Sequence, residues 1–273
     1  GVVAALHALA AAGAQARAEV VVQIVGSEED GGLGTFAALE RDDRFDAALI
    51  PEPTGFAIAC AQAGALTFSG VVPGVSAHAA VRLEGISAID RYVEVHRALA
   101  EHERRLNTDV AEPLLRGHPL PYPLSVGRVR AGEWSSSVPD RLEFEGRLGV
   151  RVGESVDEAR AAFEAVVRDA CPEASVAWTG GQFAPGATSP EDPFCRLVQS
   201  AAAEVLGASP PFVGVSYGSD MRLFAARGIP AVMFGTRGLE RAHAVDERVP
   251  VDDVVAVARV IAGVLRRFGA AAE

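Results

Sequence analysis

The stretch VVVQIVGSEEDGG, residues 20–32, runs from a β-branched apolar segment straight into two glutamates, an aspartate and two glycines. Its apolar part, extended to residues 19–25, predicts a buried strand, and LGTFAALER at 33–41 predicts the helix that follows. Two adjacent carboxylates repel each other, and a turn can be built without them. We therefore expect a positively charged partner at the end of this strand.

The same alternation of helix and strand frames the chain. A helix at 2–12 and a strand at 45–51 flank the opening stretch, and helices again alternate with strands from 193 to 268. The strands are apolar on both faces, which is typical of a parallel sheet covered by helices on both sides. The sequence therefore predicts an α/β fold with a mostly parallel sheet, incomplete in this chain, and helices on both faces.

The middle of the chain has another pattern, β-α-β-β-α-β, which is the split-βαβ motif of a ferredoxin-like domain. These elements are expected at 64–72, 85–107, 123–132, 140–152, 155–171 and 174–180. On the helix at 85–107, Ile86, Ile89, Val93, His96 and Leu99 form one stripe. We predict an inserted ferredoxin-like α+β domain at 59–182, within an α/β domain made of 1–58 and 183–273.

Composition excludes some partners. The chain has 273 residues and a net charge of −11, with 36 acidic against 25 basic residues, which argues against a nucleic-acid partner and against an anionic membrane. Its cysteines, Cys60, Cys171 and Cys195, are far apart and odd in number. This pattern predicts reduced thiols in a cytoplasmic protein.

Polar side chains follow each strand of the predicted α/β part, where open sheets bind ligands. They are Ser27, Glu28, Glu29 and Asp30 after 19–25, Glu52 after 45–51, Ser219 and Asp220 after 211–217, and His243, Asp246 and Glu247 after 231–235. Any one of them alone is common in turns. Carboxylates with imidazole and no cysteine are the ligands of zinc, cobalt or manganese in hydrolytic sites. Adjacent glutamates make sense if one binds metal and the other accepts a proton from water.

Four segments together resemble a known family: GSEEDGGLGT, PEPTG, GVSAHAA and AHAVDERVPVDD, in this order. They are similar to the two-metal amidohydrolases and metallopeptidases that include acetylornithine deacetylase, succinyl-diaminopimelate desuccinylase, aminoacylase and the glutamate carboxypeptidases. The resemblance spans nearly the whole chain. It implies hydrolysis of an amide bond in an N-acyl amino acid or small peptide by two divalent ions, zinc or else cobalt or manganese.

The resemblance also implies residue roles. Glu28 matches the general base, Glu29 and His243 match ligands of one metal, and Glu52 matches a ligand of the other. The inserted domain matches a lid that forms a homodimer, through its 85–107 helix and an edge strand. From this lid, His78 matches a histidine that stabilises the oxyanion in the partner's site.

Three further positions match substrate-binding segments of the family. Arg151 matches an arginine associated with the substrate's carboxylate, and Asp220 lies in the Gly-Thr-Asp-like segment. Ser136 stands where the family has asparagine. The family's His-x-Asp motif and bridging aspartate lie upstream of a helix that looks like residues 1–12. Because both motifs are missing, we expect this chain alone to be inactive.

Two rival interpretations stay open. GVSYG at 214–218 fits the G-x-S-x-G pattern of a serine hydrolase with Ser216 as nucleophile, although the only later histidine is His243. The chain could also be a non-catalytic homologue that serves as a dimerising scaffold. Loss of activity with a chelator, but not with a fluorophosphonate, would separate the metal-dependent enzyme from the serine hydrolase.

Overall fold

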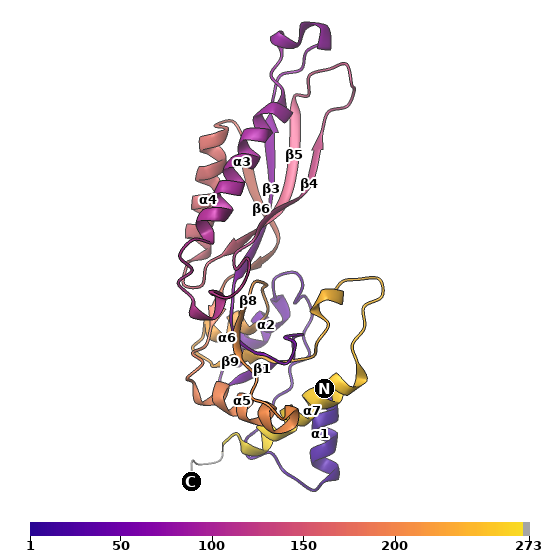
Figure 1. Ribbon diagram of the computed structural model, residues 1–273, viewed down its shortest axis with the longest axis vertical. Coiled ribbons are helices and arrows are strands. Elements are labelled where there is room, and N and C mark those ends of the chain that lie inside the picture. The colour runs from indigo at the N-terminus through magenta and orange to yellow at the C-terminus, as the bar shows by residue number, and fades with distance from the viewer. Residues whose placement is uncertain (270–273) are drawn as a thin grey trace.

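The computed structural model describes residues 1–269, which form an elongated molecule with one β-sheet toward each end (Figure 1). The sheet nearer the termini has five strands, and the sheet at the other end has four. The chain passes from the five-stranded to the four-stranded sheet at residue 63 and returns at 184–185. We call the part with the five-stranded sheet the first region and the part with the four-stranded sheet the second region.

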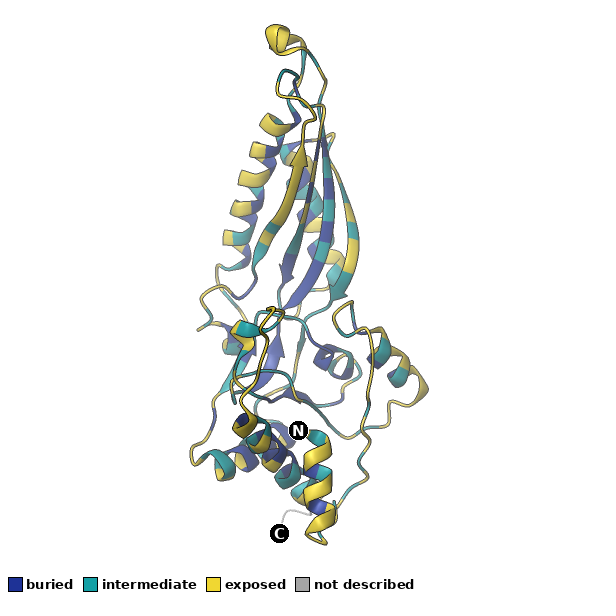
Figure 2. Cartoon of the chain, turned by 90° about the vertical axis from the view of Figure 1, so that its right-hand side faces the viewer, coloured by how far each residue is buried: buried dark blue, intermediate teal, exposed yellow. Residues whose placement is uncertain are grey.

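The second region has the predicted β-α-β-β-α-β order. Its strands are β3 (Gly64–Pro73), β4 (Leu124–Ala131), β5 (Arg141–Val150) and β6 (Ser175–Phe183), and its helices are α3 (Ala88–Leu106) and α4 (Val156–Ala170). All pairs in the sheet order β4-β5-β3-β6 are antiparallel. Figure 2 shows buried residues along the central strands and exposed ones along the edge. A capping box of Ser155 and Glu158 begins α4.

Most of the predicted stripe of α3 does not face the sheet. Ile86, Ile89, Val93 and His96 are exposed, and Leu99 is the one member of the stripe that is buried. The buried side of the helix consists of Ala88, Tyr92, Val95, Leu99, His102 and Leu106. Both sets repeat at helical spacing, so periodicity alone cannot tell which one packs inward. The choice is made by the aromatic side chains of the sheet, since Tyr92 packs on Phe144 with ring centroids 5.3 Å apart.

The first sheet is mixed, and the expectation of a mostly parallel sheet is wrong. It contains β1 (Ala48–Ile50), β2 (Ile58–Gln62), β7 (Gly186–Ala187), β8 (Phe212–Val215) and β9 (Ala231–Met233). The pairs β1–β9 and β2–β8 are parallel, while β2 is antiparallel to β7 and β9. The short link 51–57 cannot hold the crossover that parallel neighbours need, so the chain reverses into β2.

Residues 19–25 do not form the predicted strand. They are irregular, and Val21, Val22 and Ile24 are exposed. The edge strand β1 pairs only with β9 within residues 1–269, so no ladder includes this segment. A β-branched run has the propensity for a strand, but a strand also needs a partner.

Helices cover both faces of the first sheet, as expected. The core on one face joins Ile58, Cys60 and Val232 to α1 (Val2–Ala11), α5 (Pro193–Leu206) and α7 (Val251–Arg267). The opposite core joins Ala59, Ala231 and Met233 to α2 (Leu33–Arg41) and α6 (Met221–Ala225). No helix within residues 1–269 is both long and apolar enough to span a membrane.

Candidate metal centre

Glu28 and Glu29 lie in a tight loop, 26–34, that leads into α2. The amide of Gly32 donates to the carbonyl of Ser27 at 2.8 Å, and the amide of Gly34 donates to the carbonyl of Gly26 at 3.2 Å. Ser27 takes a positive φ of 61°, which closes the turn. The loop therefore presents both glutamates from a compact backbone.

Glu52 lies in the turn between β1 and β2, where Pro51 and Pro53 restrict the backbone. Thr54 fixes this turn, because its hydroxyl donates to the carbonyl of Ala57 at 2.7 Å. The same hydroxyl accepts from the amide of Gly235, just beyond β9, at 3.1 Å. The end of β9 and the Glu52 turn are thus joined.

The carboxylates of the site crowd one another. Burial, followed by the charges of Glu52, Asp220 and Glu29, raises the pKa of Glu28 to about 7, while Arg222 opposes this shift. Burial, followed by Glu29 and Asp220, also raises the pKa of Glu52. Carboxylates from the 26–34 loop, from the turn after β1 and from the residues after β8 therefore lie within electrostatic reach of one another.

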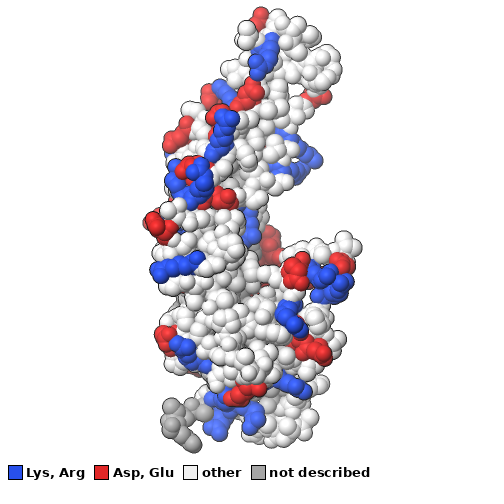
Figure 3. All heavy atoms as spheres, in the orientation of Figure 1, with Lys and Arg blue, Asp and Glu red and all other residues white. Residues whose placement is uncertain are grey.

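His243 contacts Glu29 from the loop between β9 and α7. Its Nε2 lies 3.7 Å from Oε1 of Glu29, and both side chains are exposed. The histidine has a φ of 61°, and its amide donates to Glu247 at 3.2 Å. Its loop also carries the short helix η3 (Leu239–Arg241) and projects beside a concave side of the molecule (Figure 3).

Arg237 and Asp253 fix the base of the His243 loop. The Nε of Arg237 donates to Oδ2 of the buried Asp253 at 3.0 Å, and its amide donates to the same oxygen at 3.1 Å. This charge-assisted contact joins the residues just after β9 to the first turn of α7.

The donor set suits a divalent cation, but it is loosely assembled. Carboxylates and an imidazole are ligands of zinc, cobalt and manganese, and a cation would relieve the repulsion among the glutamates. Within residues 1–269, however, no three His, Cys, Asp or Glu side chains stand together as a metal-binding group. Glu29 and His243 are in contact, with Nε2 of the histidine 3.7 Å from Oε1 of the glutamate.

A buried polar network behind the glutamates was not predicted. Asp220 accepts a hydrogen bond from Thr35 at 2.5 Å, and Arg222 donates to the carbonyl of Gly31 at 2.7 Å. Burial and then Glu52 raise the pKa of Tyr217 to about 12, and its hydroxyl has no partner among the described residues. The arginine two residues after Asp220, in GSDMR, was the available signal.

The other predicted residues lie apart from the carboxylates. His78 and Ser136 are close to each other, since the amide of Ala79 donates to the carbonyl of Ser136 at 2.9 Å. The helix η1 (Ala79–Glu84) that follows His78 is at the far end of the second region (Figure 1). The guanidinium of Arg151 donates hydrogen bonds to the carbonyls of Arg105 and Leu106 at the end of α3.

Ser216 lacks the surroundings of a nucleophile. Its carbonyl accepts from Arg147 at 3.2 Å, and within residues 1–269 its hydroxyl has no hydrogen bond to a histidine. Its φ is not positive, so this turn lacks a strained serine of the kind that a nucleophile elbow presents. His243, the only histidine after Ser216 in the sequence, lies against Glu29 instead.

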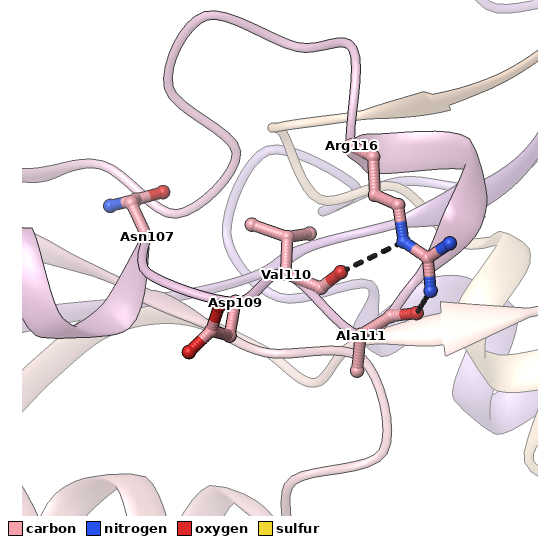
Figure 4. Close-up of a pocket in the computed structure, with 5 residues that line it drawn as sticks. All are labelled: Asn107, Asp109, Val110, Ala111 and Arg116. Carbon is pink, nitrogen blue, oxygen red and sulfur yellow. Dashed lines mark hydrogen bonds between the residues drawn. The ribbon is translucent and has the colours of Figure 1, made fainter.

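Two surface hollows differ in their relation to the site. One of about 540 Å³ is lined by Asn107, Asp109, Val110, Ala111 and Arg116, and Figure 4 shows Arg116 bonded to two carbonyls of its own loop. It includes no predicted site residue. The other, of about 310 Å³, lies beside Glu52, because Pro53, Thr54 and Tyr217 line it together with the residues before η3. The second hollow is therefore the one that adjoins the candidate metal centre.

Curated relatives of known name match this chain along its length. It is 28% identical to the succinyl-diaminopimelate desuccinylase of Rhodopseudomonas palustris (strain BisA53) over 283 residues, covering 98% of this chain and 70% of the relative. The desuccinylase of Methylocella silvestris is also 28% identical, with 97% and 69% covered.

Solved structures share the fold. The dipeptidase Dug1p of Saccharomyces cerevisiae superposes with a TM-score of 0.75 at 14% identity, over 98% of this chain and 69% of Dug1p. The aminopeptidase PepT of Bacillus cereus gives 0.68 at 21% identity over 89% of this chain, which spans only 62% of PepT. A family model described as peptidase family M20/M25/M40 matches residues 1–267. The chain belongs to this metallopeptidase family.

Proposed function

We propose that the chain provides the active-site residues of a metal-dependent hydrolase that cleaves the amide bond of an N-acyl amino acid or a small peptide. The contact of Glu29 with His243, beside carboxylates that raise one another's pKa, is the observation that supports this most. Relatives named as desuccinylases and structural neighbours named as peptidases support the same class of reaction.

Glu29 and His243 would hold one divalent ion and Glu52 a second, with zinc, cobalt or manganese as suitable metals. Such ions polarise the amide carbonyl and lower the pKa of bound water. Glu28, next to Glu29 in the 26–34 loop, takes the proton of the attacking water and returns it to the leaving amine. Asp220 stays a predicted substrate-side residue, although its carboxylate is buried against Thr35.

We further propose a homodimer through the second region. His78 and Ser136 lie at its far end, so they would act on substrate held by the carboxylates of a second copy. Ile89 and Val93 on α3 are exposed, and β4 is an edge strand open to pairing. Light scattering should give a dimer, and Val93→Asp should shift it toward monomer.

Arg151 contacts a substrate carboxylate in this proposal only if it releases the α3 carbonyls.

The chain 1–273 by itself is proposed to hold metal weakly and to lack amidase activity, because a catalytic zinc needs three protein ligands and the described residues bring two together. A non-catalytic dimerising homologue is the alternative. A cytoplasmic location, suggested by the free cysteines, stays a prediction.

The test is hydrolysis of N-succinyl amino acids, N-acetyl amino acids and dipeptides by the protein in its natural full length, with the chain 1–273 assayed beside it. We expect turnover that a chelator abolishes and a fluorophosphonate leaves intact. Glu28→Gln should keep metal and lose about 10²-fold or more in rate, whereas the control Glu19→Gln should not. Near-normal turnover by Glu28→Gln, or inhibition by the fluorophosphonate, would refute the assignment.

A further inference from the structure

We propose that Thr35, Asp220 and Arg222 are positioning residues that form a buried lock on the 26–34 loop and so fix where Glu28 and Glu29 lie. What the glutamates do there rests on the proposed function. The lock itself rests on the contacts among its own side chains and the loop.

The first contact of the lock joins α2 to α6. The hydroxyl of Thr35, in the first turn of α2, donates to Oδ2 of Asp220, the N-cap residue of α6, at 2.5 Å. Both side chains are almost fully buried, with exposures of 3% and 4%. A hydrogen bond to a carboxylate away from water is strong, and losing it leaves a buried charge unsatisfied.

Arg222 holds the loop by its backbone. Its Nη2 donates to the carbonyl of Gly31 at 2.7 Å, and its Nη1 donates to the carbonyl of Ser219 at 2.6 Å. The guanidinium also lies over the ring of Phe183, 4.5 Å from its centroid. Its planar fork can make both bonds at once, which the ammonium of a lysine cannot reproduce.

Gly32 shows how closely the loop rests on the lock. It has a φ of 72°, and a Cβ at this position would lie 2.2 Å from Oδ1 of Asp220. Only glycine combines that backbone conformation with that approach. The same oxygen has no hydrogen-bond partner among residues 1–269, so Asp220 faces the loop rather than water.

The lock is anchored to the first sheet. The hydroxyl of Ser219 donates to Oε1 of Gln62 at 2.6 Å, and Nε2 of Gln62 donates to the carbonyl of Ser219 at 3.2 Å. Gln62 is the last residue of β2 and is fully buried. Polar contacts therefore run without a break from the sheet, through 219–222, to the backbone that carries the glutamates.

The lock contacts the 26–34 loop at the residues that come directly after Glu28, Glu29 and Asp30. Arg222 binds the carbonyl of Gly31, and Asp220 lies against Gly32. These contacts use the backbone of the loop and the side chain of Thr35, whereas the carboxylate of Glu29 meets His243. Weakening the lock should therefore move the glutamates while the sheet stays folded.

Hydrogen exchange tests the lock directly, with metal removed. Thr35→Val keeps the shape and removes the donor, Thr35→Ser keeps the donor, and Thr108→Val is the matched control, since its hydroxyl donates to a carbonyl at the end of α3. Thr35→Val should speed exchange of the Gly32 and Gly34 amides about tenfold or more, with β9 unchanged. Thr35→Ser should restore the wild-type rate, and Thr108→Val should have no effect on the loop.

Unchanged loop exchange in Thr35→Val, or equal acceleration in β9, would overturn the lock. Should Thr35→Val not fold, Arg222→Lys decides by the same local readout. A parallel zinc titration should show about tenfold weaker binding for Thr35→Val and none of this loss for Thr35→Ser. If the wild-type protein bound no zinc, the proposed function would fail, and exchange would still decide the lock.

Discussion

The two regions of the molecule differ in the length of their strands and in the charge that they bury. The second is built from long strands of eight to ten residues that alternate with its two helices along the chain. The first joins strands of only two to five residues drawn from distant segments. It also buries Asp220, Arg222 and Asp253 and crowds its glutamates. The comparison teaches that the first region buries and crowds several charged side chains, whereas the second is held mainly by an apolar core, with His102 as its buried titratable side chain.

The largest expected effect tests that scaffold. Phe68 is fully buried and lies on Phe163 with ring centroids 4.5 Å apart. Phe68→Ala should lower the free energy of unfolding by about 3–5 kcal/mol. Urea denaturation followed by tryptophan fluorescence measures this, because Trp134 and Trp178 both belong to the second region. If Phe234→Ala, its match in the first region, shifted that transition equally, the regions would unfold as one and the comparison would fail.

Acid should weaken the second region through His102. Burial, followed by the charges of Arg105 and Arg151, lowers the pKa of this α3 histidine to about 4. The unfolded histidine binds a proton below its ordinary pKa of 6.5, whereas the folded one does so only near 4. The contribution of neutral His102 to the free energy of unfolding is therefore present in full above pH 6.5. It is lost as the pH falls to 4, by about 2–3 kcal/mol.

Urea midpoints at pH 7.5 and 4.5 measure the effect of His102. His102→Gln should flatten the pH dependence, and His96→Gln, at an exposed position on the same helix, should not. An unaltered slope in His102→Gln would show that another group controls it.

The first region should respond to pH with the opposite sign. The pKa of Glu28 in the folded protein, about 7, is above its ordinary value of 4.5. The contribution of protonated Glu28 to the free energy of unfolding is therefore present below pH 4.5 and is lost as the pH rises through 7. Because Glu28 is partly exposed, we expect a loss of about 1–2 kcal/mol. With chelator present, Glu28→Gln should slow exchange of the β9 amides at pH 8, and Glu19→Gln should not. Faster exchange in Glu28→Gln would contradict the crowding.

The smallest effect returns to the second region. Ser155 accepts from the amide of Glu158, whose carboxylate accepts from the amide of Ser155. Ser155→Ala should cost about 1 kcal/mol, since it removes the N-cap of α4. The measurement is again the tryptophan transition in urea. Ser189→Ala, in the first region, should leave this transition in place.

Sequence predicts the second region well because its information is local. Ser155, Glu158 and the alternating strands determine α4 and its neighbours within short stretches of chain. The sequence did not show which side of α3 faces inward, since the row of residues that includes Ile89 and the row that includes Tyr92 both have helical spacing. Only the aromatic packing of Tyr92 on Phe144 decides it.

The first region depends on contacts between distant segments. Strand β2 was missed because it lies only a short turn after β1 and reverses direction, and 19–25 has strand propensity without a partner. Glu52, Asp220 and His243 follow β1, β8 and β9, as the strand-end rule requires, whereas Glu28 and Glu29 reach the same area from the 26–34 loop although 19–25 is not a strand. The rule did not predict Thr35, whose contact with Asp220 follows from tertiary geometry, and the one signal for Arg222 was its position two residues after Asp220.

The central claim is that Glu29 and His243, from opposite halves of the sequence, bind one metal ion. Calorimetric zinc titration of the chain 1–273 tests it, with Glu29→Gln, His243→Asn, the double variant and Glu19→Gln as control. We predict weak binding that each single variant reduces about tenfold or more, and losses that are not additive in the double variant because both ligands serve one ion. Single variants that bind zinc as the wild-type chain does, or losses that simply add, would contradict the account.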